Sequence, residues 1–216
     1  MTAETLPPSA PRPQVDRAAM GEQMRKRRKA LKLTMQTVAE RAGLTAGFIS
    51  QVERGLATPS LSSLNGIARV LDLDPFSFMA LPADPGVASR QGARPLYGVD
   101  PAQLAYERLS SSFPGNVLRA VIIHEAPGHR NAPISHEGEE LFFILSGALT
   151  VEIEGARHVL GPGDSLHFPS RRVHSCWNHT AEVATMLHVC TMDVFDDSRT
   201  LAQHGRADPT PQSDGL

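Results

Sequence analysis

The sequence predicts two domains of different fold class, a helical domain followed by an all-β domain. Apolar residues recur at helical spacing from about Asp16 to Ala80, with short turns between the segments. From about Gln103 to Phe195 they form short runs of Val, Ile, Leu and Phe that are interrupted by Gly, Pro, Asn and Asp, a pattern typical of a β-sandwich or barrel. Residues 81–98 lie between these stretches and are rich in Pro, Gly, Ala and Ser, as in a linker.

The charge of the chain is divided unevenly between these two parts. The 216 residues are long enough for two small domains, and a hydrophobic content of 41% is enough to build packed cores. The net charge is −2 overall, but residues 1–80 carry +4 and the remaining residues carry −6. This asymmetry indicates that the first domain meets a polyanion, whereas the second has another role.

We expect segments without regular structure at both ends of the chain. Residues 1–14 contain four prolines and are predicted to be a disordered arm, followed by the helical domain over 15–80. The all-β domain is predicted over 99–195, and the polar residues 196–216 are predicted to form a flexible tail.

The composition favours a cytoplasmic protein that does not enter a membrane. No apolar run approaches the ~20 residues of a membrane span, and the first twenty residues lack the basic and apolar segments of a secretion signal. The two cysteines, Cys176 and Cys190, are too few for a disulfide scaffold, which favours a reducing compartment. A single disulfide between them stays an open alternative at this stage.

The first predicted helix covers residues 17–31. Met20, Met24 and Leu31 fall at helical spacing and are expected to face inward. The other face carries the basic run Arg25–Lys29, which either contacts phosphates or forms a solvated helix face.

Three shorter helices follow, each with a recognisable start or end. Thr34 is the expected N-cap of a helix from Met35 to about Ala42, which Gly43 ends because glycine tolerates the left-handed conformation. Thr45 is the expected N-cap of the next helix, which ends at Gly55. The fourth begins near Ser60, and its buried stripe is predicted to be Leu61, Leu64, Ile67, Ala68 and Leu71.

Two short helices joined by a glycine-containing turn are helix-turn-helix geometry. The residues TMQTVAERAGLTAGFISQVERGLATPSLSSLNGIARVL resemble the Cro/repressor-like (XRE-type) helix-turn-helix family, and the resemblance covers roughly residues 18–80. The matching positions are Ala39, Gly43, Ile49-Ser50, Glu53-x-Gly55, Pro59-Ser60 and Ile67-Ala68.

This resemblance implies a sequence-specific DNA-binding domain whose third helix enters the major groove. Gln51 is then expected to pair with adenine, and Phe48 or Ala46 to touch a thymine methyl group; for Phe48, packing in the core is the alternative. Gln36 and Arg54 are expected to hold phosphates and set the register. The predicted base-reading residues are Thr45, Ala46, Gly47, Phe48, Ser50 and Gln51.

The second domain carries motifs that resemble those of the cupins, which are small double-stranded β-helix or jelly-roll barrels. The first cupin motif has the form Gly, five residues, His-x-His, three or four residues, Glu, six residues, Gly. Gly128, His136, Glu140 and Gly147 match it, but Ile134 stands where the family has its first His. The second motif is matched by Pro169, His174 and Asn178, whereas Arg171 replaces a Gly.

In cupins with the full motifs, three His and one Glu hold a divalent metal, and the resemblance implies that His136, Glu140 and His174 are the ligands that survive here. Strand alternation places Glu140 and Phe142 on one face, which we expect to line the barrel. Two His and one carboxylate form a facial triad, which binds iron in other folds.

Three interpretations of this cavity stay open. The first is a site for a divalent metal such as iron, zinc, manganese or nickel, completed by His129, His167 or water. The second is a metal-free effector pocket formed by His136, Glu140, Phe142 and His174, and the third is a polar core without a ligand. His188 and Cys190 share the parity of Met186, but we expect them to face solvent or a neighbouring sheet. Cys176 shares the parity of His174, so it either lines the pocket or, as is more common for a lone buried thiol, packs as a small hydrophobic residue.

A Cro/repressor-like domain followed by one cupin resembles a class of bacterial transcription regulators, over about residues 18–195. The resemblance implies a homodimer on a palindromic double-stranded operator, with a small-molecule effector in the barrel and no catalytic residue. Coupling between the domains is expected through the linker 81–98, while its sign stays open. The alternative is a metal-dependent cupin enzyme, of dioxygenase or isomerase type, fused to a DNA-binding domain.

Overall fold

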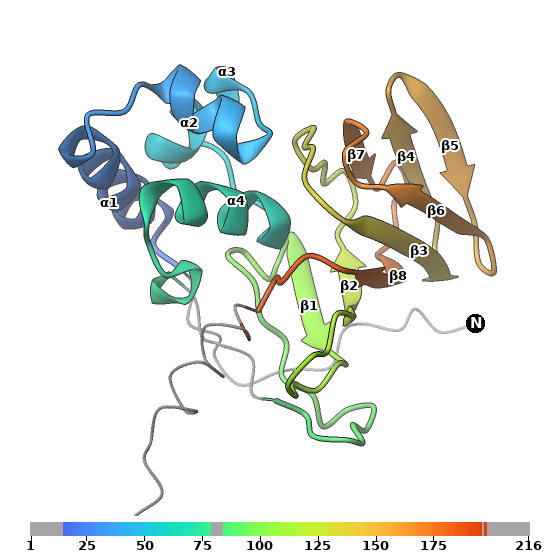
Figure 1. The fold of residues 1–216 in the computed structure, drawn as a ribbon. Coiled ribbons are helices and arrows are strands. Elements are labelled where there is room, and N and C mark those ends of the chain that lie inside the picture. Colours follow the sequence, from blue (N-terminus) through green and yellow to red (C-terminus); the bar gives the residue numbers. More distant parts are fainter. Residues whose placement is uncertain (1–14, 79–83, 196, 198–216) are drawn as a thin grey trace, which may run out of the picture.

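The structure is a computed structural model that describes residues 15–78, 84–195 and 197. It consists of a group of helices beside a β-barrel, in the order that the sequence predicts (Figure 1). The predicted arm over 1–14 and nearly all of the predicted tail lie outside the described residues. None of the helices in the described residues is long and apolar enough to cross a membrane.

The helical part begins each of its helices with a side-chain cap. The helices are α1 (Arg17–Ala30), α2 (Met35–Ala42), α3 (Ala46–Glu53) and α4 (Leu61–Leu71), and a short 3₁₀ turn (Pro75–Ser77) follows. The side chains of Asp16, Thr34, Thr45 and Ser60 accept hydrogen bonds from backbone amides of the first turns, which otherwise have no partner. The caps expected at Thr34 and Thr45 are confirmed.

The ends and buried faces of these helices follow the sequence pattern, with one exception. Gly43 ends α2 in the left-handed conformation, with φ of 67°. Met20 and Met24 are buried, as predicted, and so is the whole apolar stripe of α4. Leu31, predicted to face inward, is instead 37% exposed, because α1 ends at Ala30 and Leu31 is its C-cap residue.

Two arginines of the basic run have partners on other helices. Arg27 donates to the carbonyl of the last residue of α4 and to the carboxylate of Asp72, which follows it. Arg28 donates from Nη2 to Glu53 of α3 over 2.8 Å, and also bonds the backbone carbonyl of Leu33. Both charged side chains are almost fully buried. Arg28 therefore joins α1 to α3 and belongs neither to a solvated face nor to a phosphate contact.

Breaking this ion pair should destabilise the helical part. Glu53→Ala leaves the Arg28 guanidinium buried without its partner, and we expect the free energy of unfolding to fall by about 3–5 kcal/mol in urea denaturation. Glu22→Ala, which removes the exposed Glu22–Lys26 pair, is the control and should cost only about 0.3–0.5 kcal/mol. Equal losses for the two variants would contradict a structural role for the buried pair.

The barrel consists of two antiparallel sheets. Its strands are β1 (Leu104–Arg108), β2 (Arg119–Glu125), β3 (Glu139–Ser146), β4 (Leu149–Ile153), β5 (Ala156–Leu160), β6 (Ser165–Pro169), β7 (His174–Trp177) and β8 (Ala184–Cys190). One sheet has the order β1-β2-β8-β3-β6 and the other the order β5-β4-β7. Alternate residues of β2, β3 and β8 are buried, so that one face of the larger sheet lines the barrel interior.

Packed structure extends past the predicted end of the all-β domain. Asp197, expected in the tail, is buried and accepts two hydrogen bonds from Arg108 of β1. It also lies 3.3 Å from Arg119 of β2. Two buried guanidinium groups need carboxylates to balance their charge, and Asp197 supplies one while Asp193, 3.1 Å from Arg119, supplies the other.

Candidate functional site

The residues predicted to read DNA gather on and around α3. Thr45, Gly47 and Gln51 are exposed, whereas Phe48 is half-buried and packs against the hydrophobic core. Phe48 therefore packs in the core with part of its ring, while the exposed part stays available for contact with a thymine methyl group. The other predicted base-reading residues, Ala46 and Ser50, are also half-buried.

The two predicted phosphate-binding residues flank this surface. Arg54 follows α3 and is exposed, with Nε donating to the carbonyl of Ser50 over 3.2 Å. Gln36 is exposed in the first turn of α2, where its amide donates to the carboxylate of Glu40. Both side chains can turn toward a phosphate without breaking a buried contact.

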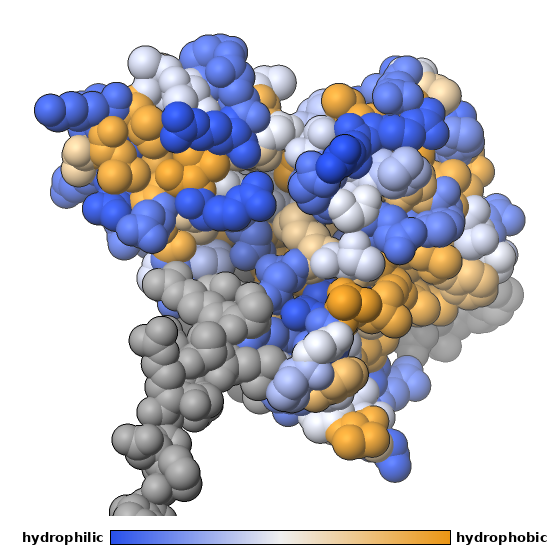
Figure 2. Space-filling model, in the orientation of Figure 1, coloured by the Kyte–Doolittle hydropathy of each residue, from blue (hydrophilic) through white to orange (hydrophobic). Residues whose placement is uncertain are grey.

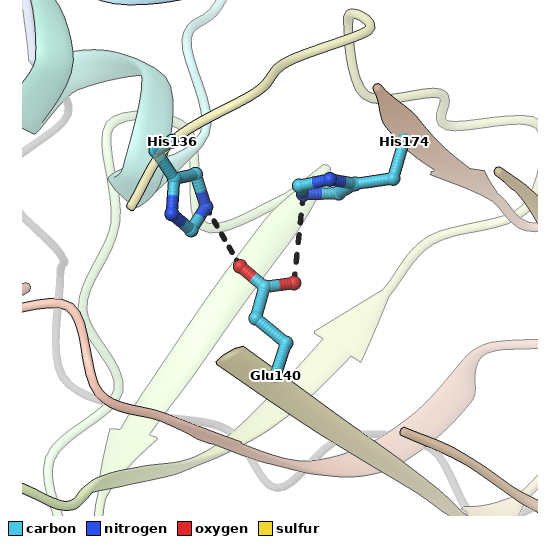
Figure 3. Close-up of side chains that lie close together, drawn as sticks. All are labelled: His136, Glu140 and His174. Carbon is cyan, nitrogen blue, oxygen red and sulfur yellow. Dashed lines mark ion pairs between the residues drawn. The ribbon is translucent and has the colours of Figure 1, made fainter. Parts of the chain in front are cut away.

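A second cluster of polar side chains lies inside the barrel (Figure 3). Glu140, near the start of β3, places Oε1 2.8 Å from Nε2 of His136 and Oε2 3.5 Å from Nε2 of His174. His136 precedes β3 and His174 begins β7, so two sheets contribute to one site. One ligand atom from each of the three residues lies within 4.8 Å of the others, as required of groups that share a metal ion.

His188 is a fourth member of this cluster, and our expectation that it faces solvent or a neighbouring sheet is wrong. It is buried, with Nε2 3.7 Å from Oε2 of Glu140 and without a hydrogen-bond partner among the described residues. The reason is that β8 lies inside the larger sheet, between β2 and β3, with His188 paired to Phe142. The shared parity with the buried Met186 was the signal in the sequence.

Burial and mutual charge set the protonation of the carboxylate. Burial is the largest influence on Glu140 and raises its pKa, but the contact with His136 and the positive charge of the three imidazoles outweigh it and bring the pKa to about 2. Glu140 is therefore ionised at neutral pH.

The pKa values of the three imidazoles shift in two different directions. Burial lowers the pKa of His174 and of His188 below the ordinary value, although the charge of Glu140 partly opposes it. Burial and Arg69 also lower the pKa of His136, but its closer contact with Glu140 raises it above the ordinary value. The lowered pKa favours the neutral form of His174 and His188, which is the form of imidazole that binds a metal ion; His136 would have to release its proton first.

The cavity around this cluster is small. Its volume is about 60 Å³, and its wall includes Ile134, Phe142 and Cys176 from the barrel. Part of the wall comes from the helical region, through Ser60–Ser62 at the start of α4. Since a water molecule in the liquid occupies about 30 Å³, the space suits an ion with one or two waters.

The other residues considered for this site lie elsewhere. His129 pairs with Glu125 over 2.9 Å, and His167 is exposed beside Glu139. Neither reaches Glu140, so neither completes a metal site there. Cys176 is buried and lines the cavity, which decides between the two alternatives left open for it, and Cys176 and Cys190 are both free thiols.

A larger cleft separates α3 from the barrel. Figure 2 shows the hollow between the two parts, and its volume is about 530 Å³. Thr45, Gly47, Phe48 and Gln51 line one side, and residues 129–133, the segment just before His136, line the other.

Comparison with known proteins agrees with this geometry. A helix-turn-helix family model matches residues 24–78, and a cupin domain model matches residues 121–190. The chain therefore contains a helix-turn-helix domain followed by a cupin domain. It has the architecture of a DNA-binding transcriptional regulator, and both resemblances seen in the sequence are confirmed.

Relatives of this helix-turn-helix cupin protein are similar over different lengths. The HTH-type transcriptional regulator PuuR of Escherichia coli is 25% identical over 181 residues, which cover 82% of this chain and 97% of PuuR. An uncharacterised HTH-type transcriptional regulator of Sinorhizobium fredii, y4dL, is 45% identical over 53 residues, 24% of this chain and 27% of that protein. The solved structure of an HTH_3 family transcriptional regulator from Vibrio cholerae is 19% identical, covers 82% of this chain and 96% of that chain, and has a TM-score of 0.49.

Proposed function

We propose that the cupin domain of this regulator holds a divalent metal ion and senses a small-molecule effector that changes operator binding. The observation that carries the proposal is the convergence of three imidazoles on the buried carboxylate of Glu140. As a regulator that acts on DNA, the protein would work in the cytoplasm.

The metal would be held by His136, Glu140 and His174, the two-histidine and one-carboxylate set of a facial triad. His188 supports this assignment, because its buried Nε2 has no other partner among the described residues and points to the same carboxylate. It stands in for the family ligand that Ile134 replaces. A bound ion would supply a positive charge that attracts anionic or oxygen-bearing groups of an effector.

Cobalt binding tests the metal site without any knowledge of the effector. We expect the metal-free protein to take up one Co²⁺ per chain, followed by visible absorption, and His174→Ala to weaken binding about 100-fold or more because a direct ligand is lost. His188→Ala should change the shape of the spectrum.

His167→Ala is the matched control, since His167 is exposed and does not reach Glu140. Cobalt uptake that is unaffected by His174→Ala would contradict the metal site and leave the metal-free effector pocket as the interpretation.

Operator reading is assigned to the exposed face of α3. Gln51 carries an amide that matches the hydrogen-bonding edge of adenine, and it is exposed beside Thr45 and Gly47. Arg54 and Gln36 would position the domain on phosphates. A palindromic operator fits a dimer that presents two such helices about 34 Å apart.

Loss of the Gln51 amide should weaken operator binding selectively. We expect Gln51→Ala to cost about 1–3 kcal/mol of affinity, measured by fluorescence anisotropy on a duplex selected from random sequences. Cobalt binding should stay unchanged. Gln23→Ala, an exposed change of the same type on α1, should bind as the unchanged protein does; equal effects of both variants would contradict the assignment of α3.

The larger sheet offers a surface for a homodimer. Its outer face exposes Leu141, Phe143 and Leu145 on β3, and Phe143 pairs with Leu187 of β8 and Leu141 with Val189. Figure 2 shows apolar residues gathered over this side of the barrel. An apolar face on three alternate positions of one strand favours burial against a second copy.

A charge on this face should separate the two chains. We expect Phe143→Asp to convert a dimer to a monomer in sedimentation equilibrium, because a carboxylate would be buried without a partner. Val159→Asp places the same charge on an exposed position of β5 in the other sheet and should leave the dimer intact. Dissociation by both variants, or by neither, would contradict this interface.

The second candidate function is a metal-dependent cupin enzyme, and the facial-triad ligand set is the observation that favours it. The two functions differ in the fate of the small molecule. A sensor releases its effector unchanged after operator binding responds, whereas an enzyme converts it. Mass spectrometry of the small molecule after incubation with the iron-loaded protein distinguishes them.

A further inference from the structure

The helix-turn-helix domain covers the cavity of the cupin site. Ser60–Ser62, at the start of α4, line the same cavity as Glu140 and His188. The backbone N–H of Leu61 donates to the hydroxyl of Tyr106 on β1 over 3.1 Å, in a buried position. This bond fixes the N-terminal end of α4 over the barrel interior, because burying the N–H group without an acceptor would cost free energy.

A second contact joins the turn of the helix-turn-helix motif to the metal-site segment. The backbone N–H of Ser135, the neighbour of His136, donates to the carbonyl of Gly43 over 3.1 Å. The fit is so close that a Cβ atom on Gly43 would collide with the carbonyl oxygen of Ser135. A shift of His136 would therefore displace the turn at Gly43, which precedes α3.

The remaining polar links between the two domains are few among the described residues. Asn65 of α4 donates to the carbonyl of Val194 over 3.1 Å, and Arg17 lies 3.8 Å from Asp100. Apolar side chains also cross the boundary, because residues of α4 and of β1 belong to one buried hydrophobic cluster. Separating the domains therefore breaks few polar links but exposes part of this cluster.

With this cover in place, the cavity does not admit a metabolite. Its volume is about 60 Å³, whereas sites for small molecules usually measure about 300–1,000 Å³. The barrel wall is built of paired strands, whereas the α4 side is held by the Leu61–Tyr106 bond and by apolar packing around it. A larger ligand would enter by moving α4 away.

The same arrangement keeps DNA away from α3. The predicted base-reading residues Thr45, Gly47, Phe48 and Gln51 face residues 129–133 across a cleft of about 530 Å³. A cleft of that volume is large enough for a small molecule. It is too small for a DNA duplex, whose major groove of about 12 Å must receive the recognition helix. DNA binding therefore requires the two domains to separate.

We propose that the helix-turn-helix domain is the lid of the cupin site, and that lifting this lid both admits the effector and frees α3 for DNA. The effector part of this proposal rests on the sensing function proposed above. Both ligands select the same open arrangement, so effector and operator strengthen each other's binding. The coupling between the two sites is therefore positive. The coupling runs through direct contacts of α4 and Gly43 with the barrel, in addition to any contribution of the linker.

The hydroxyl of Tyr106 provides a test that needs no effector. Tyr106→Phe removes the acceptor of Leu61 N–H in the closed arrangement only, because water replaces it when the domains separate. We expect the full-length variant to bind the selected operator about 5–10-fold more tightly than the unchanged protein. Small-angle X-ray scattering of the free variant should give a larger radius of gyration.

Tyr97→Phe is the matched control. Tyr97 stacks on Tyr106, with ring centroids 5.6 Å apart, and its buried hydroxyl has no hydrogen-bond partner among the residues that the structure describes. It should change neither the operator affinity nor the radius of gyration. Asn65→Ala, which removes the bond to Val194, is a second opening variant and should act in the same direction as Tyr106→Phe.

Three outcomes would overturn the lid. They are unchanged operator affinity in both opening variants, an equal gain in Tyr97→Phe, and a gain without any change in scattering. The cobalt titration on the same preparations separates this proposal from the proposed function: tighter operator binding by Tyr106→Phe without cobalt uptake would refute the metal site and support the lid.

Discussion

The buried carboxylate of Glu140 is the constraint on which the cupin half depends. An ionised group without solvent needs compensating partners, and here His136, His174 and His188 supply them from three different segments of the chain. The contacts bring β3, β7 and β8 to one point, while burial lowers the pKa of His174 and of His188. Glu140, His174 and His188 also line the small cavity, so the residues that balance the buried charge include those proposed to bind a metal ion.

This constraint reaches the DNA-reading half through a short path. His136 follows Ser135, whose amide bonds the turn residue Gly43, and the cavity around Glu140 is finished by the start of α4. The recognition helix lies between these two contact points in the sequence and faces the barrel. A ligand that changes the cavity therefore acts on the two elements that position α3, which is the physical requirement for one domain to control the other.

The features that the sequence predicted correctly are those determined by residues close together in the chain. The caps Thr34 and Thr45, the turn at Gly43 and the buried stripe of α4 all follow from helical spacing and local hydrogen bonding. His136, Glu140 and His174 were found through motif spacing, which reports strand parity and turns. His188 was missed because its environment depends on β8 lying between β2 and β3, an order that spacing along the chain does not reveal. The lid contacts have the same origin, since Leu61 and Tyr106 meet only when the two domains dock.

The distance between the domains in the free and the operator-bound protein tests the central claim most directly. This distance can be measured by pulsed electron paramagnetic resonance between spin labels on cysteines introduced at Gln23 of α1 and His158 of β5, two exposed positions. Cys176 and Cys190 are first replaced by serine so that they are not labelled. Mixing with excess unlabelled protein removes distances between subunits. The lid arrangement predicts a shift to longer distances when the operator is added, whereas an unchanged distribution in the bound complex would contradict it.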